Sequence, residues 1–128
     1  MSVLVDTCGW IEWLADGPLA ERYAPCLGRL EEVVVPTSVQ FELYKWVCRE
    51  ASEARALEVI GITEQAQVKP LDTSTALLAA DLAMQYKLSF ADAIIYATAR
   101  QCQAKLVTSD SHFQGLPSVE YFDKVAHP

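Results

Sequence analysis

The feature that most constrains the fold of this sequence is a set of short runs rich in β-branched aliphatic residues. Val3–Val5 and residues 33–35 are too short to form helices, and continuous apolar runs of this length are typical of strands that are buried on both faces of a sheet. Lys105–Thr108 has a similar apolar centre. Two weaker strands are predicted at Gln67–Lys69 and at residues 119–122.

Longer stretches with a helical spacing of apolar residues lie between these runs. Such an alternation is typical of an α/β fold, because right-handed crossovers through helices connect parallel strands. We therefore expect a central parallel sheet of about five strands flanked by helices. No repeat, linker or low-complexity tract interrupts the pattern, so residues 1–128 are predicted to form one domain. The predicted helices cover residues 8–16, 19–30, the segment after Pro36, 52–66, 73–86 and 89–102.

Composition limits the classes of function that the chain can have. Its 128 residues are 52% hydrophobic and carry a net charge of −7, which excludes intrinsic disorder and a protein that coats nucleic acid through a basic face. An enzyme that holds nucleic acid through a bound metal ion is compatible with this charge.

No uncharged apolar run is long enough to cross a membrane, and the N-terminus lacks the basic segment of a signal peptide. A cytoplasmic location is therefore predicted.

The cysteines indicate the same compartment. Cys8, Cys26, Cys48 and Cys102 are scattered and form no C-x-x-C pair, and disulfides are uncommon in the reducing cytosol. We therefore predict four reduced thiols. Because only two histidines accompany them, the spacing of a structural zinc site is absent.

Two acidic residues stand where an active site on a parallel sheet would use them. Asp6 and Asp110 each follow a predicted strand, and open parallel sheets bind ligands at the carboxyl ends of their strands. If the two strands are neighbours, about 5 Å separates their ends, and both carboxylates can share one cation. For either residue alone, an ordinary role in a turn is the alternative.

Two further acids lie in apolar helical segments. Asp92 follows Ser89 at a predicted helix start, where a Ser N-cap and an acid in the first turn also stabilise the helix. Glu42 lies between two apolar residues, and a solvated side chain is its alternative. Carboxylates that converge raise one another's pKa, and a bound divalent cation relieves their repulsion. A ligand set of Asp and Glu without His or Cys favours Mg²⁺ or Mn²⁺ over Zn²⁺.

Four segments together carry a resemblance to a known family, and they cover nearly the whole chain. They are Val3-Leu4-Val5-Asp6-Thr7 with Trp10-Ile11, Val39-Gln40-Phe41-Glu42-Leu43, Leu88-Ser89-Phe90-Ala91-Asp92-Ala93-Ile94-Ile95, and Leu106-Val107-Thr108-Ser109-Asp110-Ser111-His112-Phe113. In these motifs the chain resembles the PIN-domain ribonucleases, and among them the VapC-type toxins of toxin–antitoxin pairs. Each motif is weak alone, but all four occur here in the order and at the spacings of that family.

The resemblance implies a parallel sheet between layers of helices and a cluster of acids that binds Mg²⁺ or Mn²⁺. The activity it implies is endonucleolytic hydrolysis of RNA by a metal-activated water, which leaves a 5′-phosphate and a 3′-hydroxyl. The family often has Ser or Asn where Cys8 stands and Arg or Asn where Ser109 stands. These departures affect the hydrogen bonding around the metal and the contact with substrate, and they leave the acids intact. Carried over, the catalytic and metal-binding residues are Asp6, Glu42, Asp92 and Asp110, supported by Thr108.

The resemblance also implies partners. VapC-type toxins bind an antitoxin and usually pair as dimers, so a cognate antitoxin and a homodimer are expected beside the RNA substrate. Lys45 and Arg49 follow Glu42 on the same helical face, where they are predicted to bind RNA phosphates; a solvated basic face is the alternative. Candidates for the antitoxin or dimer surface on the first two helices are Trp13, Leu14 and Tyr23.

Other functions fit parts of the sequence. A phosphoacceptor receiver domain needs an acid pair after its first strand, and Asp6 stands there alone. A phosphatase with an Asp-x-Asp nucleophile is disfavoured because Cys8 occupies the second position. A PIN-like domain that binds RNA or protein without catalysis, and a housekeeping PIN nuclease without an antitoxin, remain open alternatives.

Overall fold

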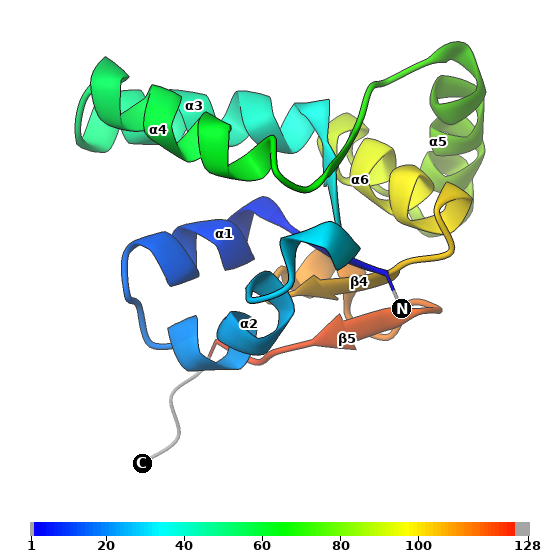
Figure 1. The fold of residues 1–128 in the computed structure, drawn as a ribbon. Coiled ribbons are helices and arrows are strands. Elements are labelled where there is room, and N and C mark those ends of the chain that lie inside the picture. Colours follow the sequence, from blue (N-terminus) through cyan, green and yellow to red (C-terminus); the bar gives the residue numbers. More distant parts are fainter. Residues whose placement is uncertain (1, 125–128) are drawn as a thin grey trace.

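The centre of the protein is a parallel sheet of five strands (Figure 1), in a computed structural model that describes residues 2–124. The strand order is β3-β2-β1-β4-β5, so the two strands that precede the acids in the sequence, β1 and β4, are direct neighbours in space. This confirms the predicted α/β fold. The strands are β1 (Val3–Val5), β2 (Val33–Pro36), β3 (Gln67–Lys69), β4 (Lys105–Thr108) and β5 (Val119–Tyr121).

Within residues 2–124, six α-helices accompany the sheet and pack as three consecutive pairs. The pair α3–α4 and the pair α5–α6 diverge from each other above the sheet in Figure 1. The prediction that all of residues 1–128 form one domain includes Met1 and residues 125–128, which lie outside the described part. The helices are α1 (Thr7–Leu14), α2 (Ala20–Leu27), α3 (Thr37–Glu50), α4 (Glu53–Thr63), α5 (Thr73–Tyr86) and α6 (Phe90–Gln101), with 3-10 turns η1 (Leu30–Glu32) and η2 (Ser111–Phe113).

The first two helices are shorter than their apolar spacing predicts. Helix α1 begins one residue early because Asp6 acts as its N-cap, and it ends before Asp16, whose φ of 52° is left-handed. Helix α2 ends at Leu27 instead of continuing to residue 30, because the chain turns at Gly28 and enters η1. The other elements match the predicted ranges to within a few residues.

The core lies between the central strands and the first helices. Val33, Val34 and Val35 are fully buried, as expected for a strand covered on both faces. Tyr23 is also fully buried, and its ring packs edge-on against that of Phe122 at 5.0 Å between centroids. The prediction that Tyr23 lies on a partner surface is therefore wrong, because its position on α2 points it inward.

Gly9 is required for this packing. A Cβ atom at Gly9 would lie 2.4 Å from Tyr23 Cε1 and 2.6 Å from Val5 Cγ1. No side chain fits there, so the glycine lets α1 approach both α2 and the sheet.

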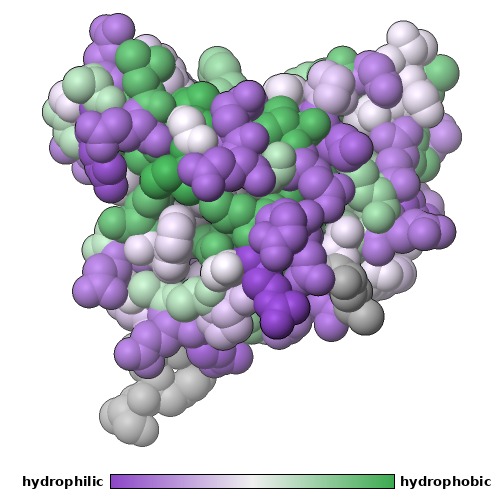
Figure 2. All heavy atoms as spheres, viewed as in Figure 1, coloured by the Kyte–Doolittle hydropathy of each residue, from purple (hydrophilic) through white to green (hydrophobic). Residues whose placement is uncertain are grey.

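The surface over α3 and α4 is apolar in places. Figure 2 shows apolar side chains over this helix pair and between the pair and α1. None of the helices in residues 2–124 has the length and apolar character that a membrane crossing requires. All four cysteines are free thiols.

Candidate functional site

The neighbouring strands β1 and β4 bring two of the predicted acids together at the carboxyl edge of the sheet. Val5 lies opposite Val107 in the parallel register. The Asp6 backbone N–H then donates to the Val107 carbonyl at 3.1 Å, which fixes the residue immediately after β1. Asp110 follows β4 by two residues and caps η2. The sheet order that the sequence left open therefore places both carboxylates at one edge.

Asp6 is the most buried of these acids, with only 5% of its surface exposed. One carboxylate oxygen accepts a hydrogen bond from the Thr7 backbone N–H at 2.7 Å, and the other accepts one from the Thr108 hydroxyl at 2.9 Å. Burial raises the pKa of Asp6 to about 6, these two hydrogen bonds oppose the rise, and the charges of Asp110 and Asp92 add to it. At neutral pH the Asp6 carboxyl is therefore ionised at a cost to the folded state, and a nearby cation would reduce that cost.

Thr108 connects Asp6 with Asp110. Its side chain is fully buried at the end of β4. The hydroxyl donates to Asp6 Oδ2 and accepts from the Asp110 backbone N–H, both at 2.9 Å. One buried hydroxyl thus fixes the first acid and the backbone that carries the second.

Asp92 reaches the same space from the first turn of α6. The Ser89 hydroxyl accepts a hydrogen bond from the Asp92 backbone N–H at 3.3 Å, so the helix-start role that the sequence suggested is also present. The Asp92 side chain is only 14% exposed. Burial and the charge of Asp110 raise its pKa, while His112 opposes the rise.

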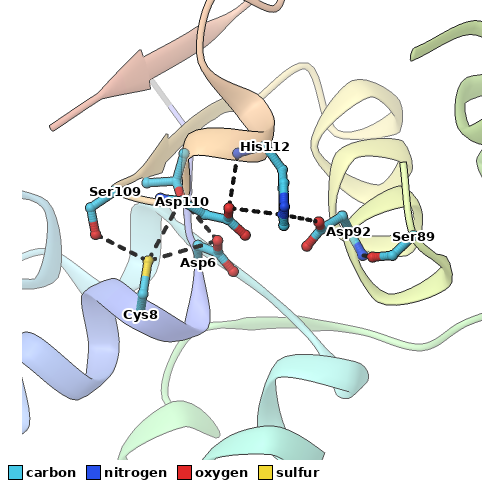
Figure 3. A network of polar contacts seen from close by, with 8 residues as sticks. Asp6, Cys8, Ser89, Asp92, Ser109, Asp110 and His112 are labelled. Atoms are coloured by element: carbon cyan, nitrogen blue, oxygen red, sulfur yellow. Dashed lines mark hydrogen bonds and ion pairs between the residues drawn. The ribbon is translucent and has the colours of Figure 1, made fainter. Parts of the chain in front are cut away.

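His112 completes this group, and the sequence reasoning missed it. Its Nδ1 lies 3.2 Å from Asp92 Oδ2 and 3.1 Å from Asp110 Oδ1 (Figure 3), and donor atoms of the three residues all lie within 4.8 Å of one another. The predicted ligand set without His stays a prediction, and it leaves out a side chain that lies beside two of its members. The signal was the spacing Asp110-x-His112, since the backbone N–H of His112 donates to Asp110 Oδ1 at 2.9 Å and both residues belong to one tight turn.

Glu42 is linked to the cluster by Thr7. The Thr7 hydroxyl donates to Glu42 Oε1 at 2.7 Å, and Thr7 directly follows Asp6, so α3 is joined to the carboxyl end of β1. The compact group whose ligand atoms lie within 4.8 Å of one another consists of Asp92, Asp110 and His112, so Glu42 and Asp6 both lie outside it among residues 2–124.

The predicted RNA-binding residues Lys45 and Arg49 lie on the same helix as Glu42 but have other neighbours. The Lys45 ammonium lies over the Phe41 ring, 5.6 Å from its centroid, and Arg49 pairs with Glu50 at 3.3 Å. Among residues 2–124, neither side chain is paired with an acid of the cluster.

The two residues that depart from the family pattern meet behind Asp6. The Ser109 hydroxyl donates to Cys8 Sγ at 3.4 Å, and the same sulfur lies 3.6 Å from the Thr108 hydroxyl and 3.9 Å from that of Tyr23. The Cys8 thiol in turn donates to Asp6 Oδ2 at 3.8 Å. Cys8 and Ser109 thus extend the hydrogen-bond network around Asp6 (Figure 3).

The donor set fits a divalent cation. Carboxyl groups of Asp6, Asp92 and Asp110 repel one another, and a cation relieves this repulsion. Ser38 follows β2 at the same edge of the sheet, and its hydroxyl is buried without a hydrogen-bond partner among the described residues. Carboxylate and hydroxyl oxygens suit Mg²⁺ or Mn²⁺.

A sequence model of the PIN domain matches residues 3–118. The chain belongs to the PIN domain family. No curated protein sequence matched this PIN domain. Its fold is similar to those of solved structures that are 17–22% identical in sequence, and at this level the likeness bears on the fold alone.

Three of these structures come from bacterial toxin systems. A toxin–antitoxin complex from Klebsiella pneumoniae contains a chain that is 22% identical, with a TM-score of 0.80 over 93% of this PIN domain and 96% of that chain. VapBC2 from Rickettsia felis bound to a promoter DNA fragment is 17% identical, with a TM-score of 0.76 and coverages of 96% and 100%. VapC20 from Mycobacterium tuberculosis, a toxin that cleaves the sarcin–ricin loop, is 17% identical, with a TM-score of 0.70 and coverages of 96% and 91%.

Proposed function

We propose that this PIN domain is a Mg²⁺- or Mn²⁺-dependent endoribonuclease and the toxin of a VapBC-type toxin–antitoxin pair. The observation that carries the proposal is the convergence of three carboxylates from separate elements, Asp6 after β1, Asp92 on α6 and Asp110 after β4. Folding brings these like charges together at an electrostatic cost, and such clusters are characteristic of functional sites.

In this proposal Asp6, Asp92 and Asp110 hold the metal ion, with Glu42 completing the set. The bound ion supplies a water of lowered pKa and neutralises the charge that develops on the scissile phosphate. The protein holds the carboxylates in place for this chemistry. The Thr108 hydroxyl fixes Asp6 relative to Asp110, and the Thr7 hydroxyl holds Glu42 toward the cluster.

Lys45 and Arg49 are proposed to bind phosphates of the RNA flanking the cleavage site. Both are exposed on α3 beyond Glu42, and a single Lys or Arg contact adds affinity for the backbone without adding base specificity. Replacing either residue with Ala should weaken RNA binding at low salt and reduce the salt dependence of binding, while the bond between Thr7 and Glu42 stays in place.

An antitoxin and a second copy of the chain are the proposed partners, and the cytoplasm is the proposed location. A groove of about 590 Å³ lies along α3 and α4 with almost entirely apolar walls. Phe41 and Leu57 line it and are 65% and 56% exposed. Exposed apolar surface of this kind marks interaction sites on proteins, and the Klebsiella and Rickettsia relatives were solved as toxin–antitoxin or VapBC assemblies.

The test is cleavage of a mixed RNA pool by antitoxin-free protein with Mg²⁺, with Mn²⁺ and with EDTA. Cleavage should require the metal and should be lost in Asp6→Asn and Asp92→Asn. Asp81→Asn is the matched control, because it removes the same charge from an exposed position on α5 and should cut like the wild type.

Three outcomes would contradict the proposal or one part of it. Full activity in Asp6→Asn would show that the cluster does not cut RNA. Mn²⁺ binding by calorimetry without cleavage of any RNA in the pool would favour a PIN domain that binds nucleic acid or protein without catalysis. Cleavage by a chain with no antitoxin gene beside its own would favour a housekeeping nuclease.

A further inference from the structure

The imidazole of His112 lies where a metal ligand would lie. Its Nδ1 is 3.2 Å from a carboxylate oxygen of Asp92 and 3.1 Å from one of Asp110. In an octahedral site with metal–ligand distances of about 2.1 Å, adjacent ligand atoms lie about 3.0 Å apart. The two observed separations are those of ion pairs, and they also allow the nitrogen and both oxygens to become neighbouring ligands of a single ion.

Packing does not force the ring into this position. The His112 side chain is 72% exposed, whereas the next residue, Phe113, is fully buried and anchors η2 to the core. Asp110 holds the turn from the other side, through the hydrogen bond that its carboxylate accepts from the His112 backbone N–H. The turn is thus fixed at both ends, and within residues 2–124 the ion pairs of the ring are those with Asp92 and Asp110.

A nitrogen donor changes the selectivity of an acidic site. Mg²⁺ prefers oxygen ligands and retains its waters, whereas imidazole suits first-row transition ions, whose affinities increase from Mn²⁺ through Co²⁺ to Ni²⁺. Within residues 2–124, His112 is the only histidine and therefore the only imidazole that can supply this nitrogen. A site made of carboxylates alone would discriminate less between Mg²⁺ and Mn²⁺.

We propose that His112 is a nitrogen ligand of the metal ion and that it selects Mn²⁺ and related transition ions over Mg²⁺. This inference rests on the proposed function, since it assigns a role to one residue of the same site. Asp92 and Asp110 supply the charge that attracts any divalent cation, and His112 supplies the preference.

The experiment measures metal binding directly, on tag-free protein, by calorimetry with Mn²⁺ and with Mg²⁺. His112→Gln removes the ring nitrogen, and His112→Asp replaces it with a carboxylate oxygen. In His112→Gln the affinity for Mn²⁺ should decrease about tenfold or more, with a much smaller change for Mg²⁺. In His112→Asp the affinity for Mg²⁺ should increase relative to that for Mn²⁺.

Pulsed electron paramagnetic resonance of bound Mn²⁺ gives a second measurement that does not depend on activity. The wild type should show coupling of the ion to a ¹⁴N nucleus, and His112→Gln should lose it. Tight Mn²⁺ binding without nitrogen coupling, or equal losses for both metals in His112→Gln, would overturn the role of His112 and leave the nuclease proposal intact. Absence of Mn²⁺ binding in the wild type would overturn both.

Discussion

Replacing Asp6 with Asn should make the metal-free protein more stable at neutral pH, although it removes a residue of the proposed active site. Asp6 is 5% exposed, and burial raises the pKa of its carboxyl from 3.8 to about 6. The ionised side chain therefore destabilises the folded state at pH 7. Asn has the same shape and removes the charge.

The magnitude follows from linkage between ionisation and folding. A carboxyl whose pKa is raised from 3.8 to about 6 costs the folded state about 3 kcal/mol at pH 7. The Asn carbonyl can still accept from the Thr7 backbone N–H, but its amide nitrogen then faces the Thr108 hydroxyl, and the rearranged bond costs about 1 kcal/mol. The expected net gain is about 2 kcal/mol, or roughly 7 °C in Tm for a chain of 128 residues.

The pH dependence gives the sign of the effect. A raised pKa means that the folded state binds more protons than the unfolded state, so the wild type loses stability as the pH increases from about 4 to 6. Asp6→Asn lacks this loss. Its advantage should be complete at pH 7, shrink as the pH falls below 6, and vanish or reverse near pH 4.

The assay is thermal and urea unfolding, followed by circular dichroism, from pH 4 to 7 in buffer with EDTA. Asp81→Asn, exposed on α5, should change the free energy of unfolding by no more than about 0.5 kcal/mol. An Asp6→Asn variant less stable than the wild type at pH 7, or an advantage that stays constant with pH, would refute the idea that the buried carboxylate destabilises the fold.

Three further changes probe the fold, the site and the apolar groove. Gly9→Ala should lower the free energy of unfolding by about 1–3 kcal/mol in urea titrations, because its Cβ would overlap the buried side chain of Tyr23. Thr108→Val should cost about 1–3 kcal/mol and weaken Mn²⁺ binding in calorimetry, since the Asp110 N–H loses its acceptor, whereas Thr108→Ser should retain both properties. Phe41→Ser with Leu57→Ser should abolish capture of the co-expressed antitoxin and leave Tm nearly unchanged, because both side chains are exposed; unchanged capture would exclude the groove as the antitoxin site.

Most of the fold could be predicted because the central strands have a clear sequence signal. The apolar runs at Val3–Val5 and residues 33–35 have few alternatives at that length. The sequence did not determine the strand order, since pairing between β1 and β4 joins segments about one hundred residues apart. The ends of α1 and α2 were misplaced by one to three residues, because the left-handed residue Asp16 and the turn at Gly28 override the apolar spacing.

The site was predictable where it depends on residue type after a strand, and less so where it depends on contacts. Asp6 and Asp110 follow their strands and meet as the parallel order requires. His112 was missed because its position beside Asp92 and Asp110 arises from a turn that only the folded chain displays. Tyr23 was misjudged because an apolar stripe on a helix does not say whether another helix or a partner covers it.

The same contacts explain why the cluster can persist without unfolding the protein. The Thr108 hydroxyl and the Thr7 backbone N–H donate hydrogen bonds to the Asp6 carboxylate, and these offset part of the cost of burying it. The remaining repulsion between the carboxylates is relieved when a cation binds. This relief increases the affinity for the cation, and an ion that binds only the folded state stabilises the fold. Mn²⁺ should therefore raise the Tm of the wild type more at pH 7 than at pH 5, where protons already neutralise Asp6. In Asp6→Asn the metal-induced rise in Tm should be smaller at pH 7, and the pH dependence that remains should come from Asp92, whose pKa is also raised.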